Sequence, residues 1–300
     1  MKVGNTANRG YLLALTAGIL WSTLGVLGKI SFKYGADPLT VVTLRAIIAF
    51  ITLFIILIIV NREFFKIKRK DLLFFVLFGL VGVTLIYSSY FHTIKLTSVS
   101  TAVLLLYTYP AFVIVFSAYF FHEKINTIKI FALLFIFLGC FLITNAYNFK
   151  SLKLNYAGIL CGITAALTVA IYNIFGKKAL QNYNSQTVVF YAFGFGALFL
   201  LFIRDPRFIL KINLSLNVWI IILILAWIPT LLAYFLYISS LKYIEVGRAS
   251  IVSTIEPVVA SLLAYIFLKE TMSYVQIIGT FLILISVIAI GFSQIRSNPD

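Results

Sequence analysis

Two ionisable side chains, Glu256 and Arg45, lie inside long apolar segments of this chain. A charged group in hydrocarbon is costly unless it faces a cavity or a partner. Together the two could bind a zwitterion, with Arg45 on a carboxylate and Glu256 on an amine, or Glu256 could carry a proton. Two plainer interpretations stay open: a protonated Glu256 hydrogen-bonded between helices, and an Arg45 whose long stem reaches the membrane surface.

Aromatic and small polar side chains in the same segments could complete such a binding site. They can pack on the apolar part of a substrate and bond its polar groups, although a single aromatic residue more often anchors a helix at the interface. The remaining candidate substrate-binding residues are Trp21, Ser22, Tyr87, Tyr90, Tyr109, Tyr172, Asn173, Trp227, Tyr234, Tyr237 and Ser253.

Ten charge-poor segments must position these residues. Hydrophobic residues make up 62% of the chain and charged residues 11%, with a mean hydropathy of +1.06, whereas a soluble domain has roughly 25% charged residues. A helix of about 20 apolar residues crosses a bilayer, so the composition predicts an all-α integral membrane protein. The expected spans are about 10–32, 39–61, 71–92, 98–121, 127–146, 155–176, 185–203, 217–239, 248–268 and 273–294.

The second half of the chain repeats the first at an offset of 147 residues. The pattern predicts two five-helix repeats, residues 1–147 and 148–300, which together form one membrane domain. Because five is an odd number, the second repeat must be inverted relative to the first, as in many secondary transporters. The offset relates Tyr87 to Tyr234, Tyr90 to Tyr237, Lys95 to Lys242, Ala102 to Ala249, Pro110 to Pro257 and Glu123 to Glu270.

Helix-breaking residues lie at matching depths in the two repeats. Pro110 and Pro257 fall near the middle of the fourth and ninth spans, and Gly82 in the third span matches Pro229 in the eighth. A proline inside a membrane helix frees the carbonyl one turn back and bends the axis. Breaks that are paired in this way indicate a central substrate site with hinges around it, and static kinks are the alternative.

The lysines and arginines predict the topology. With the N-terminus inside, 14 of them lie on the cytoplasmic side and nine outside, and the excess depends mainly on the loop from Arg62 to Lys70. By the positive-inside rule we expect a multi-pass protein of the cell membrane with both termini in the cytoplasm.

Several function classes are excluded at this stage. The net charge is +15, and the lysines and arginines that produce it flank apolar runs rather than forming a basic face. The expected partners are therefore the lipid bilayer and a small-molecule substrate, not nucleic acid. Cys140 and Cys161 read as small buried side chains, and the two histidines, His92 and His122, cannot build a metal cluster. No cofactor is expected. Without a nucleotide-binding loop or an intramembrane His-Asp or Ser-Lys pair, the chain is not expected to be an enzyme.

These residues resemble the drug/metabolite transporter superfamily, specifically its EamA-type ten-helix permeases. The resemblance covers essentially the whole chain and is carried by Leu20-Trp21-Ser22 with Gly28-Lys29, by Leu44-Arg45-Ala46, and by the stretches Pro110–Glu123 and Glu256–Glu270. It implies that spans three, four, eight and nine line the substrate path. The family more often has Leu or Gly before the terminal Glu, where this chain has His122 and Lys269.

The resemblance and the buried polar residues together favour a secondary transporter. We expect it to export small metabolites, amino acids or related compounds, by alternating access, with protons as the coupling ion or by facilitated diffusion. A carrier for sugars, nucleotide-sugars or drugs of the same superfamily is the nearest alternative. A channel and a non-transporting membrane scaffold are the alternatives from other classes.

Overall fold

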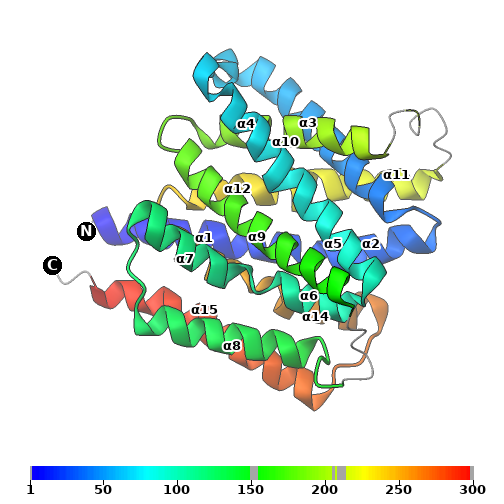
Figure 1. Cartoon of the computed structure of the whole chain (residues 1–300), viewed down its shortest axis with the longest axis vertical. Helices are drawn as coiled ribbons and strands as arrows, with labels where there is room; N and C mark the ends of the chain where they lie inside the picture. Colours follow the sequence, from blue (N-terminus) through cyan, green and yellow to red (C-terminus); the bar gives the residue numbers. More distant parts are fainter. Residues whose placement is uncertain (1, 149–154, 205–206, 208–213, 298–300) are drawn as a thin grey trace.

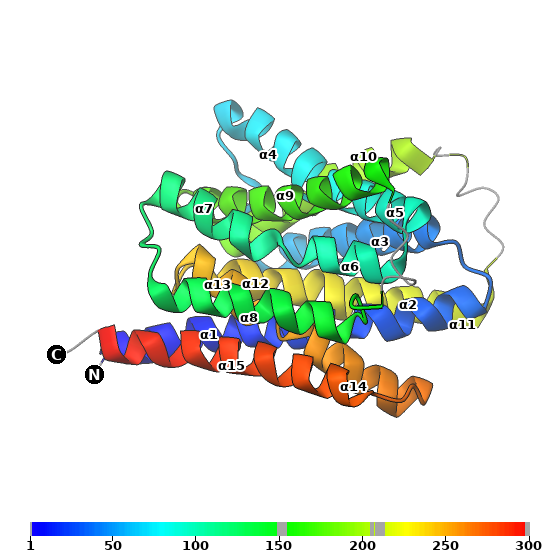
Figure 2. The same cartoon turned by 60° about the horizontal axis from the view of Figure 1, so that its bottom comes forward.

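A computed structural model describes residues 2–148, 155–204, 207 and 214–297, and within these ranges the chain is helical with no β-strand. Nine helical segments are long and apolar enough to cross a membrane, and the shorter apolar helix α8 (Thr127–Ile143) completes ten spans. The prediction of an all-α protein with ten spans is therefore confirmed. The helices run roughly side by side, and both chain ends lie at the same end of the bundle (Figures 1 and 2). We call it the terminal end and the other the opposite end.

The ten spans are built from fifteen α-helices and two π-helical turns within the described residues. In the first half they are α1 (Lys2–Trp21), α2 (Thr23–Lys33), α3 (Pro38–Val60), α4 (Leu72–Gly79), η3 (Leu80–Leu85), α5 (Ile86–Leu96), α6 (Val99–Leu106), α7 (Tyr109–Phe121) and α8. In the second half they are α9 (Tyr156–Ala179), α10 (Ser185–Arg204), α11 (Leu216–Leu225), η5 (Ala226–Leu232), α12 (Ala233–Ser240), α13 (Val246–Ser253), α14 (Glu256–Leu268) and α15 (Tyr274–Ser297).

The third and eighth spans both change to π-helical geometry in their middle. Gly82 lies in η3 and Pro229 in η5, at equivalent positions. A π-turn leaves carbonyl groups without their usual partner, and a threonine hydroxyl serves one of them in each span. Thr84 donates to the Gly79 carbonyl at 3.2 Å and Thr230 to the Leu225 carbonyl at 2.8 Å. Both spans thus keep an irregular segment near the bundle centre with its polar groups satisfied.

The fourth and ninth spans are each interrupted just before their proline. One span stops at Leu106 and restarts as α7, with Pro110 in the first turn, and the other stops at Ser253 and restarts as α14, with Pro257 in the first turn. Proline is tolerated there because first-turn N–H groups have no intrahelical partner. Each broken span therefore presents the positive end of a second helix dipole near mid-membrane.

The two broken spans also end in the same way. His122 and Lys269 follow α7 and α14 in the left-handed conformation, each with φ near 56°. Glycine adopts this conformation without a steric penalty, which explains physically why Gly would suit these positions. In each turn the next residue bonds back to the helix: the Glu123 N–H donates to the Ser117 carbonyl at 3.4 Å and the Glu270 N–H to the Ala264 carbonyl at 3.3 Å.

The fifth and tenth spans, α8 and α15, pack against each other along the lower side of the bundle in Figure 1. Their backbones approach closely at Gly139 and Gly279, where an added Cβ on Gly139 would lie 2.7 Å from the Gly279 carbonyl oxygen. These two spans therefore form one closely packed pair at the side of the bundle.

Candidate substrate site

The centre of the bundle holds an aromatic group on the axis that relates the two repeats. The hydroxyl oxygens of Tyr87 and Tyr234, which are equivalent residues, lie 3.2 Å apart and share a hydrogen bond. The ring of Tyr234 is packed by Trp21 at 5.0 Å, Tyr172 at 5.4 Å and Phe193 at 4.9 Å between centroids. Such edge-to-face contacts are favourable aromatic geometries. Side chains from spans one, three, six, seven and eight meet here.

Arg45 lies beside this aromatic group and does not reach the surface. Its side chain, from α3, is only 5% exposed, and its guanidinium carbon lies 4.7 Å from the centroid of the Tyr87 ring. A desolvated cation over an aromatic face is stabilised by the ring quadrupole. The structure therefore favours the buried interpretation of Arg45 over the surface-reaching one.

Several buried polar atoms in the central region have no partner among the described residues. They include the Trp21 Nε1, the Arg45 Nε and the Tyr172 hydroxyl, together with Ser88 Oγ and Thr43 Oγ1. Most buried polar groups in proteins are hydrogen-bonded, so each exception needs an explanation. The tryptophan and arginine nitrogens can only donate. The central group is therefore suited to a ligand that brings hydrogen-bond acceptors.

Glu256 lies on the other side of this region, in the first turn of α14. Its carboxyl group interacts with the Tyr107 hydroxyl and with the charge of Arg45, and Tyr90 also lies within its electrostatic range. A carboxylate in the first turn of a helix is stabilised by the helix dipole. Opposite charges thus face the same internal region from spans two and nine.

Other candidate residues already have partners within the protein. The Tyr109 hydroxyl bonds to Ser253 Oγ at 2.9 Å, which joins the two broken spans to each other, and the Tyr237 hydroxyl bonds to the Asn173 side chain, which joins α12 to α9. Ser22 lies between α1 and α2 and donates to the Ile19 carbonyl at 2.5 Å. These contacts hold the framework of the site and leave the unpartnered donors to a ligand.

Trp227 is not brought to the central group. It is 48% exposed, and its Nε1 donates to Thr52 Oγ1 at 3.0 Å on the outside of the bundle. Tyr107 and Phe193 are close to the site, but sequence reasoning did not single them out as ligands. Tyr107 directly precedes the break before α7, and that position is the signal that could have found it.

A buried ionic cluster closes the terminal end. Glu123 accepts hydrogen bonds from the backbone N–H groups of Val246 at 2.7 Å and Gly247 at 3.1 Å. Lys129, only 1% exposed, lies 3.0 Å from a Glu245 oxygen and 3.8 Å from a Glu123 oxygen. Opposite charges that are buried together must be well paired to be tolerated. This cluster joins the loop after α7 to the start of α13.

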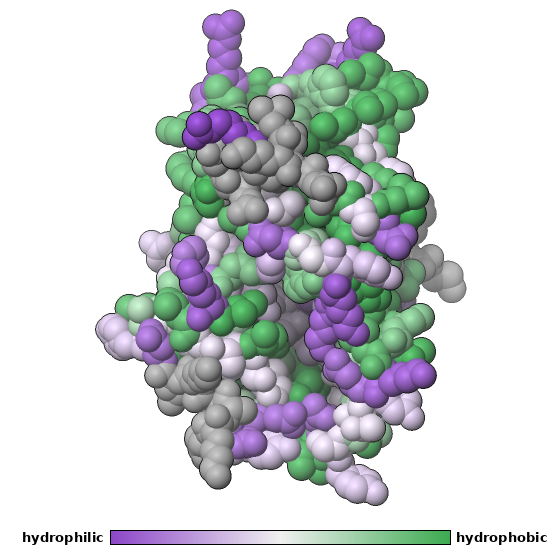
Figure 3. Space-filling model, turned by 90° about the vertical axis from the view of Figure 1, so that its right-hand side faces the viewer, coloured by the Kyte–Doolittle hydropathy of each residue, from purple (hydrophilic) through white to green (hydrophobic). Residues whose placement is uncertain are grey.

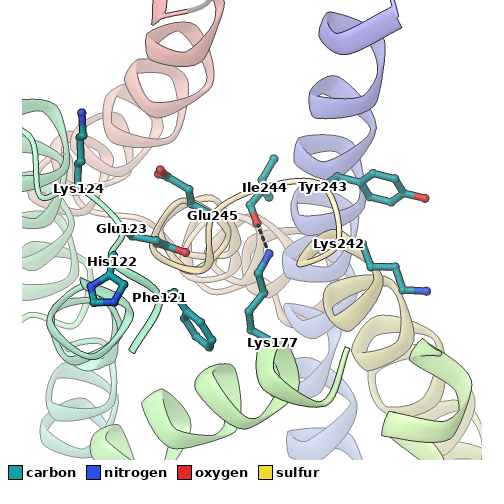
Figure 4. A pocket seen from close by; sticks show the side chains of 9 residues that line it. All are labelled: Phe121, His122, Glu123, Lys124, Lys177, Lys242, Tyr243, Ile244 and Glu245. Atoms are coloured by element: carbon teal, nitrogen blue, oxygen red, sulfur yellow. Dashed lines mark hydrogen bonds between the residues drawn. The ribbon is translucent and has the colours of Figure 1, made fainter. Parts of the chain in front are cut away.

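Further contacts extend the cluster across the terminal end. Arg248 donates to Glu245 at 2.8 Å and to Ser293 Oγ at 2.8 Å, and Lys177 donates to the Ile244 carbonyl at 3.4 Å. Burial alone would raise the pKa of Glu245, but Lys129 and Arg248 hold that pKa below its ordinary value. Figure 4 shows Glu123, Glu245 and Lys177 around a shallow pocket of about 480 Å³.

The opposite end is packed less closely at the equivalent place, because α6 makes no contact with α14 comparable to that of α13 with α7. A hollow of about 520 Å³ lies between the start of α6 and the turn after α14. Hydrophilic side chains surround a recess on this end of the molecule (Figure 3). Glu270 is half exposed and pairs with Lys29 at 2.7 Å. The hollow is lined by Ser100, Asn145, Tyr147, Asn148, Thr271, Met272, Ser273 and Gln276.

No group of three or more His, Cys, Asp or Glu side chains with metal-binding geometry occurs in the described ranges. The cysteines there, Cys140 and Cys161, are free thiols.

Comparison with known proteins gives consistent matches over the full length. Residues 8–145 and 156–292 each match the model of the EamA-like transporter family. An uncharacterized transporter of Archaeoglobus fulgidus is 29% identical over 93% of this chain and 95% of its own length. The uncharacterized inner membrane transporter YicL of Salmonella typhimurium is 27% identical over 98% of both chains. A solved crystal structure has the same fold, with a TM-score of 0.82 over 97% of this chain and 99% of that chain, at 18% identity.

Proposed function

Because this chain belongs to the EamA-like transporter family and is a multi-pass membrane transporter, we propose that it exports amino acids or related small zwitterions. The observation that carries this proposal is the set of unpartnered buried donors on Trp21, Arg45 and Tyr172. A substrate carboxylate supplies the acceptors that these donors lack, and Glu256 lies where an amine can be bound.

Charge pairing on both sides explains the choice of a zwitterion. Guanidinium groups bind carboxylates with charge-assisted hydrogen bonds, which are stronger than neutral ones. A purely anionic substrate would leave the carboxylate charge of Glu256 without a partner, and a purely cationic substrate would leave the charge of Arg45 without a partner. The aromatic rings of Tyr87 and Tyr234 offer an apolar wall to the rest of the substrate.

Transport follows alternating access across the cell membrane, with the terminal end in the cytoplasm. The excess of lysine and arginine at that end supports this orientation. We propose that Glu256 carries the coupling proton. Without proton coupling, the same transport cycle would be facilitated diffusion. Sugars, nucleotide-sugars and drugs are the competing substrates.

A thermal-shift series on the purified protein tests the substrate class. Leucine is compared with leucinol, which lacks the carboxylate, and with 4-methylpentanoate, which lacks the amine. A ligand present at 100 times its dissociation constant stabilises the binding state by about 2.7 kcal/mol. We expect leucine or another amino acid to stabilise the protein and both analogues to do so far less.

Variants of Arg45 and Glu256 test which residue binds the substrate carboxylate and which binds the amine. We expect Arg45→Gln to remove the preference for leucine over leucinol, and Glu256→Gln to remove the preference over 4-methylpentanoate. Tyr172→Phe should weaken binding, whereas Tyr119→Phe, on a side chain that is 76% exposed, serves as the matched control. Stabilisation by a sugar or nucleotide with none by any amino acid would contradict the proposed substrate.

A further inference from the structure

We propose that Glu123 and Glu270 are alternate latches, each of which closes its own end of the bundle by accepting backbone N–H bonds from a broken helix of the other half. Glu123 latches onto the start of α13 at the terminal end, and Glu270 latches onto the start of α6 at the opposite end. Only one latch is engaged at a time. The inference rests on the proposed alternating access and names residues that carry it.

The terminal latch is engaged in this structure. The Glu123 carboxylate is bound by the first two N–H groups of α13, and its side chain is only 8% exposed. Helix N-termini leave N–H groups unpaired and carry positive partial charge, so a carboxylate is favoured there. Glu245, the residue before α13, makes no side-chain cap bond to the helix. Glu123 therefore supplies the cap from the other half of the protein, and all eight residues of α13 are buried.

The opposite latch has equivalent parts in a separated arrangement, with one difference: Ser98, the equivalent of Glu245, caps α6 itself by accepting a bond from the Thr101 N–H at 3.2 Å. Only Thr101 and Ala102 of α6 are buried, and Val99, the equivalent of Val246, is 59% exposed. At the closed end α13 packs on α7 and α8, while α6 makes no comparable contact with α14 or α15. Glu270 is held instead by Lys29 at the surface.

The hollow at the opposite end marks the place where the second latch would close. Ser100, Thr271, Ser273 and Gln276 line it, and they are the equivalents of Gly247, Lys124, Asn126 and Lys129 at the closed end. Asn126 and Ser273 cap α8 and α15 in the same way. The spacing of 13 residues from Pro110 to Glu123 and from Pro257 to Glu270 is also shared. Movement of α14 toward α6 would therefore bring Glu270 to the N–H groups of Val99 and Ser100.

The test uses a cysteine at the closed end to report on the latch at the opposite end. In a Cys140→Ala, Cys161→Ala background, Val246→Cys places a thiol where the present side chain is fully buried. Its labelling rate with a maleimide, measured on purified protein in detergent, reports how often the terminal end opens. Because no substrate is needed, the readout is independent of the proposed substrate.

We expect Glu270→Gln to slow this labelling about tenfold, since the state in which the opposite end is latched loses a charge-assisted cap. Lys29→Gln is the matched control, because it breaks the same surface ion pair but leaves the carboxylate. It frees Glu270 to latch and should therefore accelerate the labelling. Glu123→Gln should accelerate it as well.

Labelling that is unchanged in Glu270→Gln, or slowed equally by Glu270→Gln and Lys29→Gln, would overturn the latch. Transport measured in the same variants separates the two proposals. Substrate flux that persists with unaltered labelling would refute the latch alone, and absence of flux in the parent protein would refute the proposed function.

Discussion

The two ends of the bundle are made from equivalent residues and are arranged differently. At the terminal end Glu123 is buried against the backbone of α13, and at the opposite end Glu270 is half exposed on Lys29. Both glutamates follow the same left-handed turn. One local sequence pattern therefore supports two arrangements, one with the glutamate buried and one with it exposed. The energy difference between them must come from neighbouring residues that are not equivalent.

Lys129 is the neighbour that differs most, because its equivalent at the opposite end is Gln276. Lys129→Gln would give the two ends the same residue at this position, and we expect the largest effect here. Removal of one partner from a buried ionic cluster typically costs about 3–5 kcal/mol. We expect a loss of about 3 kcal/mol in the free energy of unfolding, near the lower limit because Glu123 keeps its two backbone partners. Denaturant unfolding in detergent measures it.

Gln276→Ala is the control for that variant. It removes the bond from Gln276 Nε2 to the Ile143 carbonyl and the bond from the Ser273 N–H to Gln276 Oε1, which together correspond to about 1–2 kcal/mol. Equal losses of unfolding free energy for Lys129→Gln and Gln276→Ala would show that the buried charge of Lys129 does not cause the difference between the two ends.

Substitutions at two glycines of the first span test how tightly each end is packed. A Cβ on Gly10 would lie 2.8 Å from both Tyr243 and Ile244 at the terminal end, whereas a Cβ on Gly25 meets nothing within 4 Å. We expect Gly10→Ala to destabilise the protein by about 1–3 kcal/mol through overpacking. Gly25→Ala should cause no loss, because alanine is the better helix former. Thermal unfolding of both variants is the measurement, and a harmless Gly10→Ala would mean that the terminal end is loosely packed.

The charge state of Glu245 should also make the terminal end sensitive to pH. Lys129, Arg248, Glu123, Lys177 and Tyr11 surround it, and its pKa in the folded protein lies below the ordinary value. Its contribution to closure is therefore fully present above about pH 4.3, the ordinary glutamate value, and is lost as pH falls through the lower folded pKa.

Val246→Cys labelling from pH 8 to pH 4, with and without Glu245→Gln, checks this expectation. The ratio of the two labelling rates, in which the common pH dependence of the thiolate cancels, should stay constant down to about pH 5 and approach one only in more acidic solution. A ratio that already approaches one between pH 8 and pH 6 would contradict the sign of the shift.

The smallest effect on stability should come from the ion pair at the open end. Lys29 and Glu270 are 54% and 50% exposed, and exposed pairs typically contribute about 0.2–1 kcal/mol. We expect Lys29→Gln to change the unfolding free energy by no more than this, and the change should fall with added salt. A loss as large as that of Lys129→Gln would mean that the two ends are held equally tightly.

The sequence alone predicts the spans and the positions of the irregular segments within them. Apolar length alone locates ten helices, and Pro110, Pro229 and Pro257 cannot continue a regular helix because they lack an N–H group. The sequence therefore predicts how deep each residue lies along its span. It does not predict which way each side chain points around the helix, and for this reason Trp227 was included among the candidate residues although it lies on the outside.

The ionic cluster at the terminal end could not be read from the sequence. Lys129, Lys177 and Arg248 stand at the ends of apolar runs, where basic residues usually report topology. Only the packing of α8, α9 and α13 shows that Lys129 and Arg248 are buried, and Lys177 half-buried, among carboxylates and carbonyls. The sequence does contain the replacement of Lys129 by Gln276 at the equivalent position, but only the structure shows that Lys129 is buried and paired.

The most direct test of alternate closure is a pair of distance measurements with spin labels at equivalent positions. One pair, Lys124→Cys with Lys242→Cys, spans the terminal end, and the other, Thr271→Cys with Lys95→Cys, spans the opposite end, all in the cysteine-free background. We expect the terminal pair to be closer than the opposite pair, and Lys29→Gln to lengthen the first distance while it shortens the second. Equal distances at the two ends, or changes in the same direction, would contradict alternate closure.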